Sequence, residues 1–599
     1  MSFMAGRRLS VATLFPTRPL NRTSTVTTTR DRVFSPVLQE MEKTSAPGPD
    51  MAGDMVMTDA HAPIPGLSTI PPEIVELILD FLIPQPPEIG ETRPVAYGQL
   101  IPAEPWFDFT RCRRGLRSLC LVSRRLSEMA RPLLYRNAVI LDETALILFF
   151  RTLCTNPHYG RWSRYLSCHL TLSSNSVIRE VRELLPKYLP TITPAPGTGA
   201  LLTATRHFLQ MLSQLFPKMV LSEGDFDHVP QALLCFILMF LDKVETVLLQ
   251  VPISDDQPEY DVLCAQIEGV QDLFRKEPQA VPFHSIRTLM LQGDPELLAQ
   301  IEDDECECDV PDGWGAQPRR YSSLFANFPN VTTLEVSSDD GVWNLDLEQH
   351  PFMFLIDDSP PEPFMPNIRH IYLHNSVAYP GDLHHLLRNA PKLETLYMAP
   401  RGDKSLKQVV DNTAGEHPDS LNIALAEHAK NLRNLDVSWE DIWGFEALVG
   451  PEGRLTSIAE MGSLRTLCVQ LALLYGKPSA VLETPLVDML PPNLVELALE
   501  DWWWSNLQLL EELPTWDTEA KVRHYQSQHL YRTAALRILT EFARDVRTRL
   551  RDLKKMVLLV KIPWTWVLED AVSLDFHFEV VKSVFLGQGV EFSVKCDEV

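Results

Sequence analysis

The stretch Ala390-Pro391-Lys392-Leu393-Glu394-Thr395-Leu396-Tyr397-Met398 shows the pattern that governs most of this chain. A proline interrupts a helical segment, and Leu393, Leu396 and Met398 follow with the spacing apolar-x-x-apolar-x-apolar. We call this spacing the 1-4-6 motif. Its second half alternates apolar and polar residues, which is typical of a strand with one buried face.

The 1-4-6 motif recurs along the chain. Its clear copies are Val244-Val247-Leu249, Ile286-Leu289-Leu291, Val331-Leu334-Val336, Ile368-Ile371-Leu373, Leu393-Leu396-Met398, Leu432-Leu435-Val437, Leu464-Leu467-Val469 and Leu494-Leu497-Leu499. Weaker copies are Tyr165-Cys168-Leu170 and Leu553-Met556-Leu558. Helical segments are predicted before most copies, at Pro230–Leu241, Ser322–Asn327, Asp382–Asn389, Leu421–Ala429 and Leu455–Met461. A helix-turn-strand unit repeated every ~25 to 45 residues predicts an α/β solenoid over about residues 140–599.

A different pattern occupies Ile70–Leu82. Its apolar residues follow the i, i+3, i+4, i+7, i+8 spacing of one helix face, and they are Ile74, Leu77, Ile78, Phe81 and Leu82. Pro71 and Pro72 suit the first turn of this helix, because amide hydrogens there have no helical partner. A second helical stretch, expected to end at Pro132, repeats the spacing with Leu116, Leu119, Val122, Leu126 and Met129. Helices this short cannot bury their apolar faces alone, so we expect them to pack on each other and on another protein.

At these helices the chain resembles the F-box, a small helical module that binds the adaptor subunit of cullin-type ubiquitin ligases. The resemblance implies an F-box over residues 67–136. The residues that it implies for adaptor binding are Ile70, Pro71, Glu73, Ile74, Ile78, Leu79, Leu121, Val122 and Ser123. The chain departs from the family pattern at Leu126, where an aromatic residue is usual, and in a Pro-rich insertion at about residues 84–110. An ordinary helical hairpin is the alternative.

The repeating unit is similar to the leucine-rich repeats of F-box proteins, particularly the irregular kind in fungal chains. Most copies lack the terminal asparagine of a regular repeat, so a horseshoe of uniform curvature is not expected. Together the resemblances imply a substrate-recognition subunit of an SCF ubiquitin ligase, a non-catalytic protein that holds a substrate near the ubiquitin carrier. The competing interpretation is a repeat scaffold whose F-box-like helices only cap the solenoid.

Residues between the apolar positions of each motif should face away from the core, because side chains alternate along a strand. On this outer face the candidate substrate-binding residues are His370, Tyr372, His374, Tyr397 and Asp436. Three further candidates, Trp502, Trp503 and Trp504, follow a predicted strand directly. These tryptophans either cover the rim of the solenoid or anchor a partner.

Composition limits the classes of partner. The 599 residues carry a formal net charge of -25, whereas nucleic acids and acidic membrane surfaces attract basic proteins. No apolar run approaches the roughly 20 residues of a membrane-spanning helix, and the ten scattered cysteines indicate reduced thiols. We therefore expect no nucleic-acid or membrane partner and a location in the cytoplasm or nucleus.

The N-terminal tail, residues 1–66, differs in composition from the rest. Five arginines precede its first acidic residue, Asp31, and Thr23–Thr29 is almost entirely Ser, Thr and Val. This composition predicts disorder. Because transit peptides are also Arg-rich and acid-poor, mitochondrial import is the alternative for this segment.

The sequence offers little evidence for catalysis. It contains no G-x-S-x-G, no G-x-x-x-x-G-K-[ST] and no H-E-x-x-H motif. Cys306 and Cys308 lie in an acidic stretch without a second Cys or His pair, which indicates a solvated loop rather than a zinc site. His384 and His385 are neighbours on a predicted helix and point about 100° apart, so they do not share a ligand easily. We expect no enzyme activity, no cofactor and no metal.

Overall fold

The structure is a computed structural model of the full chain. It describes residues 71–83, 103–140, 143–169, 229–251, 283–293, 325–337, 363–376, 380–400, 420–437, 454–475, 484–501, 536–562 and 578–598, apart from residues 326 and 364. The chain divides into two units, Met1–Gly66 and Leu67–Val599, and all described residues belong to the second. The predictions for the tail, for Cys306 and Cys308, and for Trp502–Trp504 lie outside these residues.

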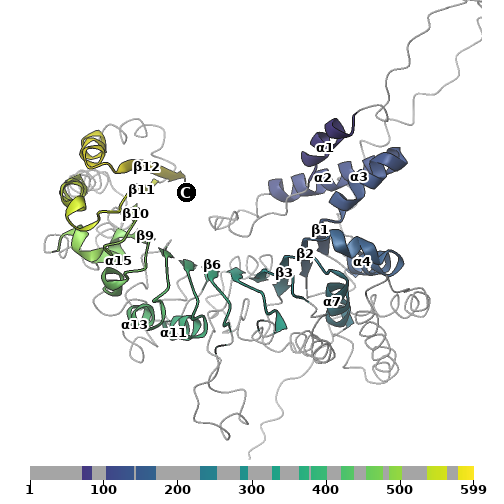
Figure 1. The fold of residues 1–599 in the computed structure, drawn as a ribbon, viewed down its shortest axis with the longest axis horizontal. Helices are drawn as coiled ribbons and strands as arrows, with labels where there is room; N and C mark the ends of the chain where they lie inside the picture. The colour runs from purple at the N-terminus through teal and green to yellow at the C-terminus, as the bar shows by residue number, and fades with distance from the viewer. Residues whose placement is uncertain are drawn as a thin grey trace, which may run out of the picture. The chain divides into compact units, whose positions relative to one another are not determined.

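The described strands form one parallel sheet of 12 strands whose spatial order is their order in the chain (Figure 1). The strands are β1 Asn137–Ile140, β2 Tyr165–His169, β3 Thr246–Val251, β4 Thr288–Gly293, β5 Thr333–Ser337, β6 His370–Ser376, β7 Thr395–Pro400, β8 Asn434–Val437, β9 Thr466–Gln470, β10 Glu496–Asp501, β11 Lys555–Ile562 and β12 Glu591–Glu598. Parallel neighbours require a crossover between each pair. The predicted α/β class is confirmed.

The 1-4-6 motif explains the strands β3 to β11. In all nine copies each of the three apolar side chains is at most 2% exposed. Paired strands align these residues in rows; for example, Leu396 of β7 lies beside Leu435 of β8. The rows belong to one hydrophobic cluster, which also includes residues of the helical segments. Burial of this apolar surface is the main favourable term in the folding of the sheet.

The predicted motif copy at β2 is wrong by two residues. The pairing of β2 with β3 aligns Leu166 with Val247 and Cys168 with Leu249, so position 1 of the motif is Ser163 rather than Tyr165. Ser163 is fully buried, and its hydroxyl donates a hydrogen bond of 2.9 Å to the carbonyl oxygen of Tyr135. That hydrogen bond lets a polar residue occupy the apolar position.

Helices lie along one face of the sheet (Figure 1). They are α4 Glu143–Thr155, α7 Val229–Phe240, α11 Pro380–Asn389 and α13 Ser420–His428. Later connections use the 3-10 segments η10 Ser457–Glu460 and η12 Leu486–Met489, the short helix α15 Leu471–Tyr475, and helical residues 536–549 and 578–587. The α-helical segment predicted at Leu455–Met461 is therefore shorter and tighter than expected.

Asparagines link successive turns beside the strands. Asn330, Asn367, Asn431 and Asn493 each directly precede position 1 of a motif, and each side chain donates to a backbone carbonyl oxygen of the preceding turn over 2.7 to 3.1 Å. Backbone hydrogen bonds continue between the turns, as from Arg433 N to Glu394 O. These bonds explain why the sequence repeatedly places Asn where a helical segment gives way to a strand.

The N-terminal helices are α1 Pro72–Asp80, α2 Ala103–Val122 and α3 Arg124–Leu134. Three boundaries differ from the prediction, and one of them is the end of α3, which continues past Pro132 to Leu134. Helix α2 begins at Ala103, inside the predicted insertion, because Pro105 falls in the first turn, where proline is tolerated. The single helix expected to end at Pro132 is two helices separated at Ser123, whose side chain accepts a hydrogen bond from Leu126 N over 3.2 Å as the N-cap of α3.

These helices also contact the sheet. Phe109 of α2 packs with Val139, Tyr165 and Leu248 on the face opposite the helical layer. Arg131 of α3 donates a hydrogen bond of 2.8 Å to the hydroxyl of Tyr159, which lies in the 3-10 segment η4 Pro157–Trp162. The helices therefore cover the first strands of the sheet. Among the described residues, no helix combines the length and the apolar composition that a membrane-spanning segment needs.

Candidate protein-binding surfaces

Helix α1 presents much of its predicted apolar face to solvent. Its contacts with α2 and α3 come from Val75 and Leu79, which are 4% and 2% exposed and pack with Leu116, Leu126 and Ala130. The predicted stripe does not form this core, because Leu82 is its only member that packs there. The buried face of α1 is thus rotated away from the stripe.

Six exposed apolar side chains form what we call the docking surface. They are Ile74, Leu77, Ile78, Phe81, Leu121 and Val122, with exposed fractions of 45, 56, 43, 86, 83 and 56%. Ten large apolar side chains are exposed among the described residues, and the other four are spread over α4, α13 and the helical residues 578–587. Exposed apolar side chains concentrated on one helix, as the first four are on α1, are typical of a protein-binding site.

The residues implied for adaptor binding fall into three groups. Pro71, Glu73, Ile74, Ile78, Leu121 and Val122 are exposed. Leu79 is buried in the core of the three helices, and the half-buried Ser123 caps α3. Ile70 lies outside the described residues. Leu77 and Phe81 are also exposed, but neither is among the residues that the F-box resemblance implies for adaptor binding.

The outer face of the sheet brings together the predicted substrate-binding residues. We call Glu335, Tyr372, His374, Tyr397 and Asp436 the polar strip. Strand pairing places Glu335, Tyr372, Tyr397 and Asp436 in one row across β5 to β8. His374 Nε2 lies 3.4 Å from Glu335 Oε1, and its ring centroid lies 4.9 Å from that of Tyr397.

His370 lies beside the polar strip, with its Nδ1 3.1 Å from Thr395 Oγ1. The rings of Tyr372 and Tyr397 are 6.3 Å apart between centroids. All five predicted residues of the described strands therefore share one face, and each is partly exposed. Whether this face binds a substrate stays a prediction.

Acidic groups gather at one end of the polar strip. Burial and the nearby carboxylate of Glu500 raise the pKa of Asp436 from 3.8 to about 7, and a hydrogen bond from Cys468 opposes this rise. One carboxylate oxygen of Asp436 is buried without a hydrogen-bond partner among the described residues. With Glu335, these side chains make the outer face of β5 to β10 a favourable place for a positive charge.

Replacing Asp436 with Asn is expected to stabilise the protein above neutral pH. Because the pKa of Asp436 is higher in the folded than in the unfolded chain, its contribution to stability declines as pH rises from about 4 to about 7. The amide carries no charge, so the gain should be about 1 to 3 kcal/mol at pH 8 and smaller at pH 5. Urea unfolding at both pH values measures it, and equal stability of the two proteins at pH 8 would contradict the prediction.

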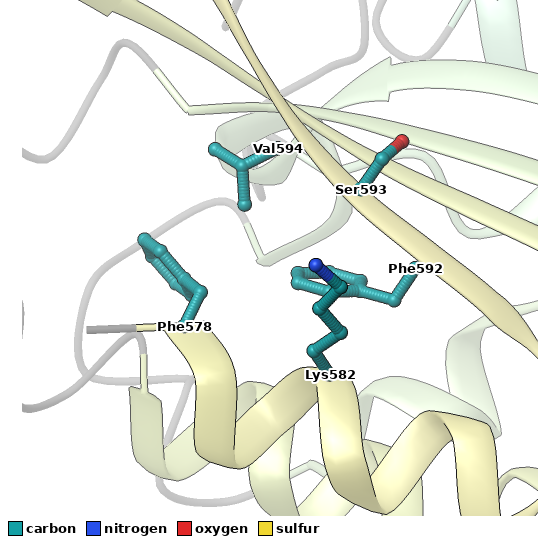
Figure 2. A pocket seen from close by; sticks show the side chains of 5 residues that line it. All are labelled: Phe578, Lys582, Phe592, Ser593 and Val594. Atoms are coloured by element: carbon teal, nitrogen blue, oxygen red, sulfur yellow. The ribbon is translucent and has the colours of Figure 1, made fainter. Parts of the chain in front are cut away.

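A small pocket lies between helical residues 578–587 and β12 (Figure 2). Phe578 and Lys582 line it from the helix, and Phe592, Ser593 and Val594 line it from the strand. Its volume of about 100 Å³ is well below the roughly 300 to 1,000 Å³ of small-molecule sites. The protein-binding surfaces are therefore the stronger candidates.

Two histidines from neighbouring helices meet within the helical layer. His384 of α11 and His428 of α13 have their Nε2 atoms 3.4 Å apart, and Glu427 Oε2 lies 3.7 Å from His428 Nε2. Burial and the adjacent His384 lower the pKa of His428, while Glu427 opposes this shift. Sequence reasoning missed the cluster because the two histidines are 44 positions apart, and they meet only through the packing of the two helices.

Comparison of the chain with protein-family models and with the curated proteins finds no match.

Proposed function

We propose that this protein is a substrate-recognition subunit of a cullin-type ubiquitin ligase, in which α1 to α3 act as an F-box. The observation that carries the proposal is the docking surface, six apolar side chains exposed on α1 and at the end of α2. They lie on the helices whose sequence, from Pro71 to Val122, resembles the F-box pattern.

The structure of these helices suits docking on a partner. Val75 and Leu79 hold α1 on α2 and α3, so the docking surface is presented on a preformed scaffold. Burying apolar surface is favourable by roughly 25 cal/mol per Å², and a preformed surface loses little conformational entropy on binding. Aromatic and aliphatic anchors such as Phe81 and Leu77 are side chains that contribute strongly to protein interfaces.

The sheet would hold the substrate. Its strands follow one another in chain order, and a helical or 3-10 segment precedes most of them. This arrangement supports a leucine-rich-repeat-like solenoid. In repeat proteins of this kind the exposed strand face is a common binding surface. The polar strip combines two tyrosines with carboxylates, so we propose that the substrate presents a segment rich in Lys or Arg.

No step of covalent chemistry is assigned to this chain. Its contribution to ubiquitin transfer would be proximity, because a bound substrate lysine is held at a high effective concentration near the charged ubiquitin carrier. The adaptor would connect the docking surface to the rest of the ligase.

The second candidate function is a repeat scaffold in which α1 to α3 only cap the sheet. The contacts of Phe109 with Val139 and of Arg131 with Tyr159 favour it, because they fasten α2 to strand β1 and α3 to the segment η4 that precedes β2. Capping accounts for the buried sides of α2 and α3. It gives no reason for the exposure of Phe81 and Leu121.

The experiment that separates the two functions is a calorimetric titration of the full-length chain with the purified adaptor of a cullin ligase. The proposal predicts a saturable complex of one adaptor per chain. No heat of binding at micromolar concentrations of both proteins would favour the scaffold.

Substituting both Tyr372 and Tyr397 with Ala should weaken substrate capture by about 1 to 3 kcal/mol each, the range for interfacial aromatics. Fluorescence polarisation with two peptides of equal length, one rich in Lys and Arg and one rich in Asp and Glu, provides the measurement. The wild-type chain is expected to prefer the basic peptide. Thr466→Ala, on the outer face of β9, is the control. Equal binding of both peptides, or unchanged binding by the double variant, would refute the assignment.

A further inference from the structure

His384 of α11 and Glu427 and His428 of α13 bring three potential metal ligands close together. The Nε2 atoms of the two imidazoles face each other at 3.4 Å, and their ring planes are inclined by 72°. One potential ligand atom from each of the three residues lies within 4.8 Å of the other two. Two ring nitrogens and a carboxylate oxygen are ligand types that zinc prefers.

The spacing between the ligand atoms fits one metal ion. Zinc binds imidazole nitrogen at about 2.0 to 2.1 Å, so two such nitrogens in tetrahedral coordination lie about 3.3 Å apart. The observed separation of 3.4 Å agrees with this value. Glu427 Oε2 is 3.7 Å from His428 Nε2, and the three ligand atoms lie within 4.8 Å of one another, so the exposed glutamate side chain would have to move closer to complete the site.

The C-terminal end of helix α13 contributes a negative potential at the cluster. His428 is the last residue of α13, and the C-terminal end of a helix carries a partial negative charge. Glu427 adds a full negative charge, whereas Arg388 and Lys430 lie near enough to oppose it. Glu427 and His428 are adjacent on the helix, but the long glutamate side chain reaches towards the imidazole.

We propose that His384, Glu427 and His428 bind a zinc ion that ties helix α11 to helix α13. Three protein ligands leave a fourth position for water or for a side chain of a bound protein. The ion would join two consecutive repeating units through their helices, on the side of the sheet opposite the polar strip. Because zinc would bind the folded chain, it should raise the stability of the protein.

The test is a zinc titration of the full-length chain after treatment with a chelator, followed by calorimetry. Other residues of the chain can also bind zinc, so the number of zinc ions bound per chain is compared between the wild type and the double variant His384→Ala/His428→Ala. The double variant should bind one zinc ion fewer. His370→Ala, which removes a histidine from the outer face of β6, should bind as many ions as the wild type. Cobalt in place of zinc should give the intense visible absorption of tetrahedral coordination in the wild type and lose it in the double variant.

A second variant, Glu427→Gln, tests the proposal if the double variant does not fold. Glu427 has a side chain that is 58% exposed, so Glu427→Gln should keep the fold and weaken zinc binding at this site at least tenfold. Zinc should raise the thermal unfolding midpoint of the wild type more than that of either variant. Equal zinc stoichiometry in the wild type and in a folded double variant, or no zinc bound by the wild type, would overturn the proposal and leave a simple hydrogen bond between two histidines.

Discussion

The double substitution Leu77→Asp/Phe81→Asp is expected to abolish binding of the cullin adaptor. Leu77 is 56% exposed and Phe81 is 86% exposed, so neither side chain is needed for the packing of α1. Anchors of an interface contribute about 2 kcal/mol or more each, and an aspartate in their place would bury an unpaired charge. The affinity measured by calorimetry should fall at least about 100-fold.

The matched control is Val580→Asp/Leu586→Asp. These two residues are also exposed apolar side chains on a helical segment, with exposed fractions of 66% and 73%, but they lie outside the docking surface. Their substitution should leave adaptor binding unchanged, and both double variants should keep the unfolding free energy within about 0.5 kcal/mol of the wild type. Equal adaptor binding by the Leu77→Asp/Phe81→Asp variant and the wild type would show that the docking surface does not bind the adaptor.

Replacing Gly160 with Ala is expected to destabilise the protein by about 3 kcal/mol or more. Gly160 lies in η4 against the end of α7, and an added Cβ would overlap the carbonyl oxygen of Phe240 and lie 2.9 Å from its carbonyl carbon. The obstacle is backbone, so a side-chain rotation cannot relieve the overlap and the main chain of η4 or α7 must shift. Urea unfolding should show a lower midpoint, with reduced yield of folded protein.

Gly462→Ala provides the comparison, because a Cβ at Gly462 would meet no atom within 4 Å. Its unfolding free energy should stay within about 0.5 kcal/mol of the wild type. If Gly160→Ala were as stable as Gly462→Ala, the close approach of η4 to α7 would be wrong.

The strands could be predicted because their evidence is local. In Leu393-Leu396-Met398 and its counterparts, burial on one strand face and a turn before the strand require a fixed spacing of apolar residues, and this spacing is visible in the sequence. The same alternation identified the outer face that carries Tyr372, Tyr397 and Asp436. Residues on neighbouring strands then meet because the motif positions of β3 to β11 pair with one another.

The ends of the sheet were harder to predict because other interactions replace an apolar residue. Ser163 fills position 1 before β2 by donating a hydrogen bond to Tyr135. Before β12, the equivalent of Leu553 is Gly589, whose φ of +71° favours glycine and leaves the motif without its first apolar residue. Phe592 and Val594 alone did not distinguish β12 from a loop.

Periodicity also could not decide which side of α1 faces the core. Apolar residues occur on two sides of this helix, and contacts with α2 and α3 select Val75 and Leu79, leaving Ile74 and Phe81 exposed. The meeting of His384 with His428 depends likewise on helix packing. These features arise from distant contacts that a local pattern does not contain.

Hydrogen exchange of the full-length chain, alone and with the purified cullin adaptor, tests the central claim most directly. Adaptor binding should slow amide exchange in residues 71–82 and 116–126 and leave the polar strip in β5 to β8 unchanged. Protection confined to the sheet, or no protection anywhere at saturating adaptor, would contradict the F-box assignment.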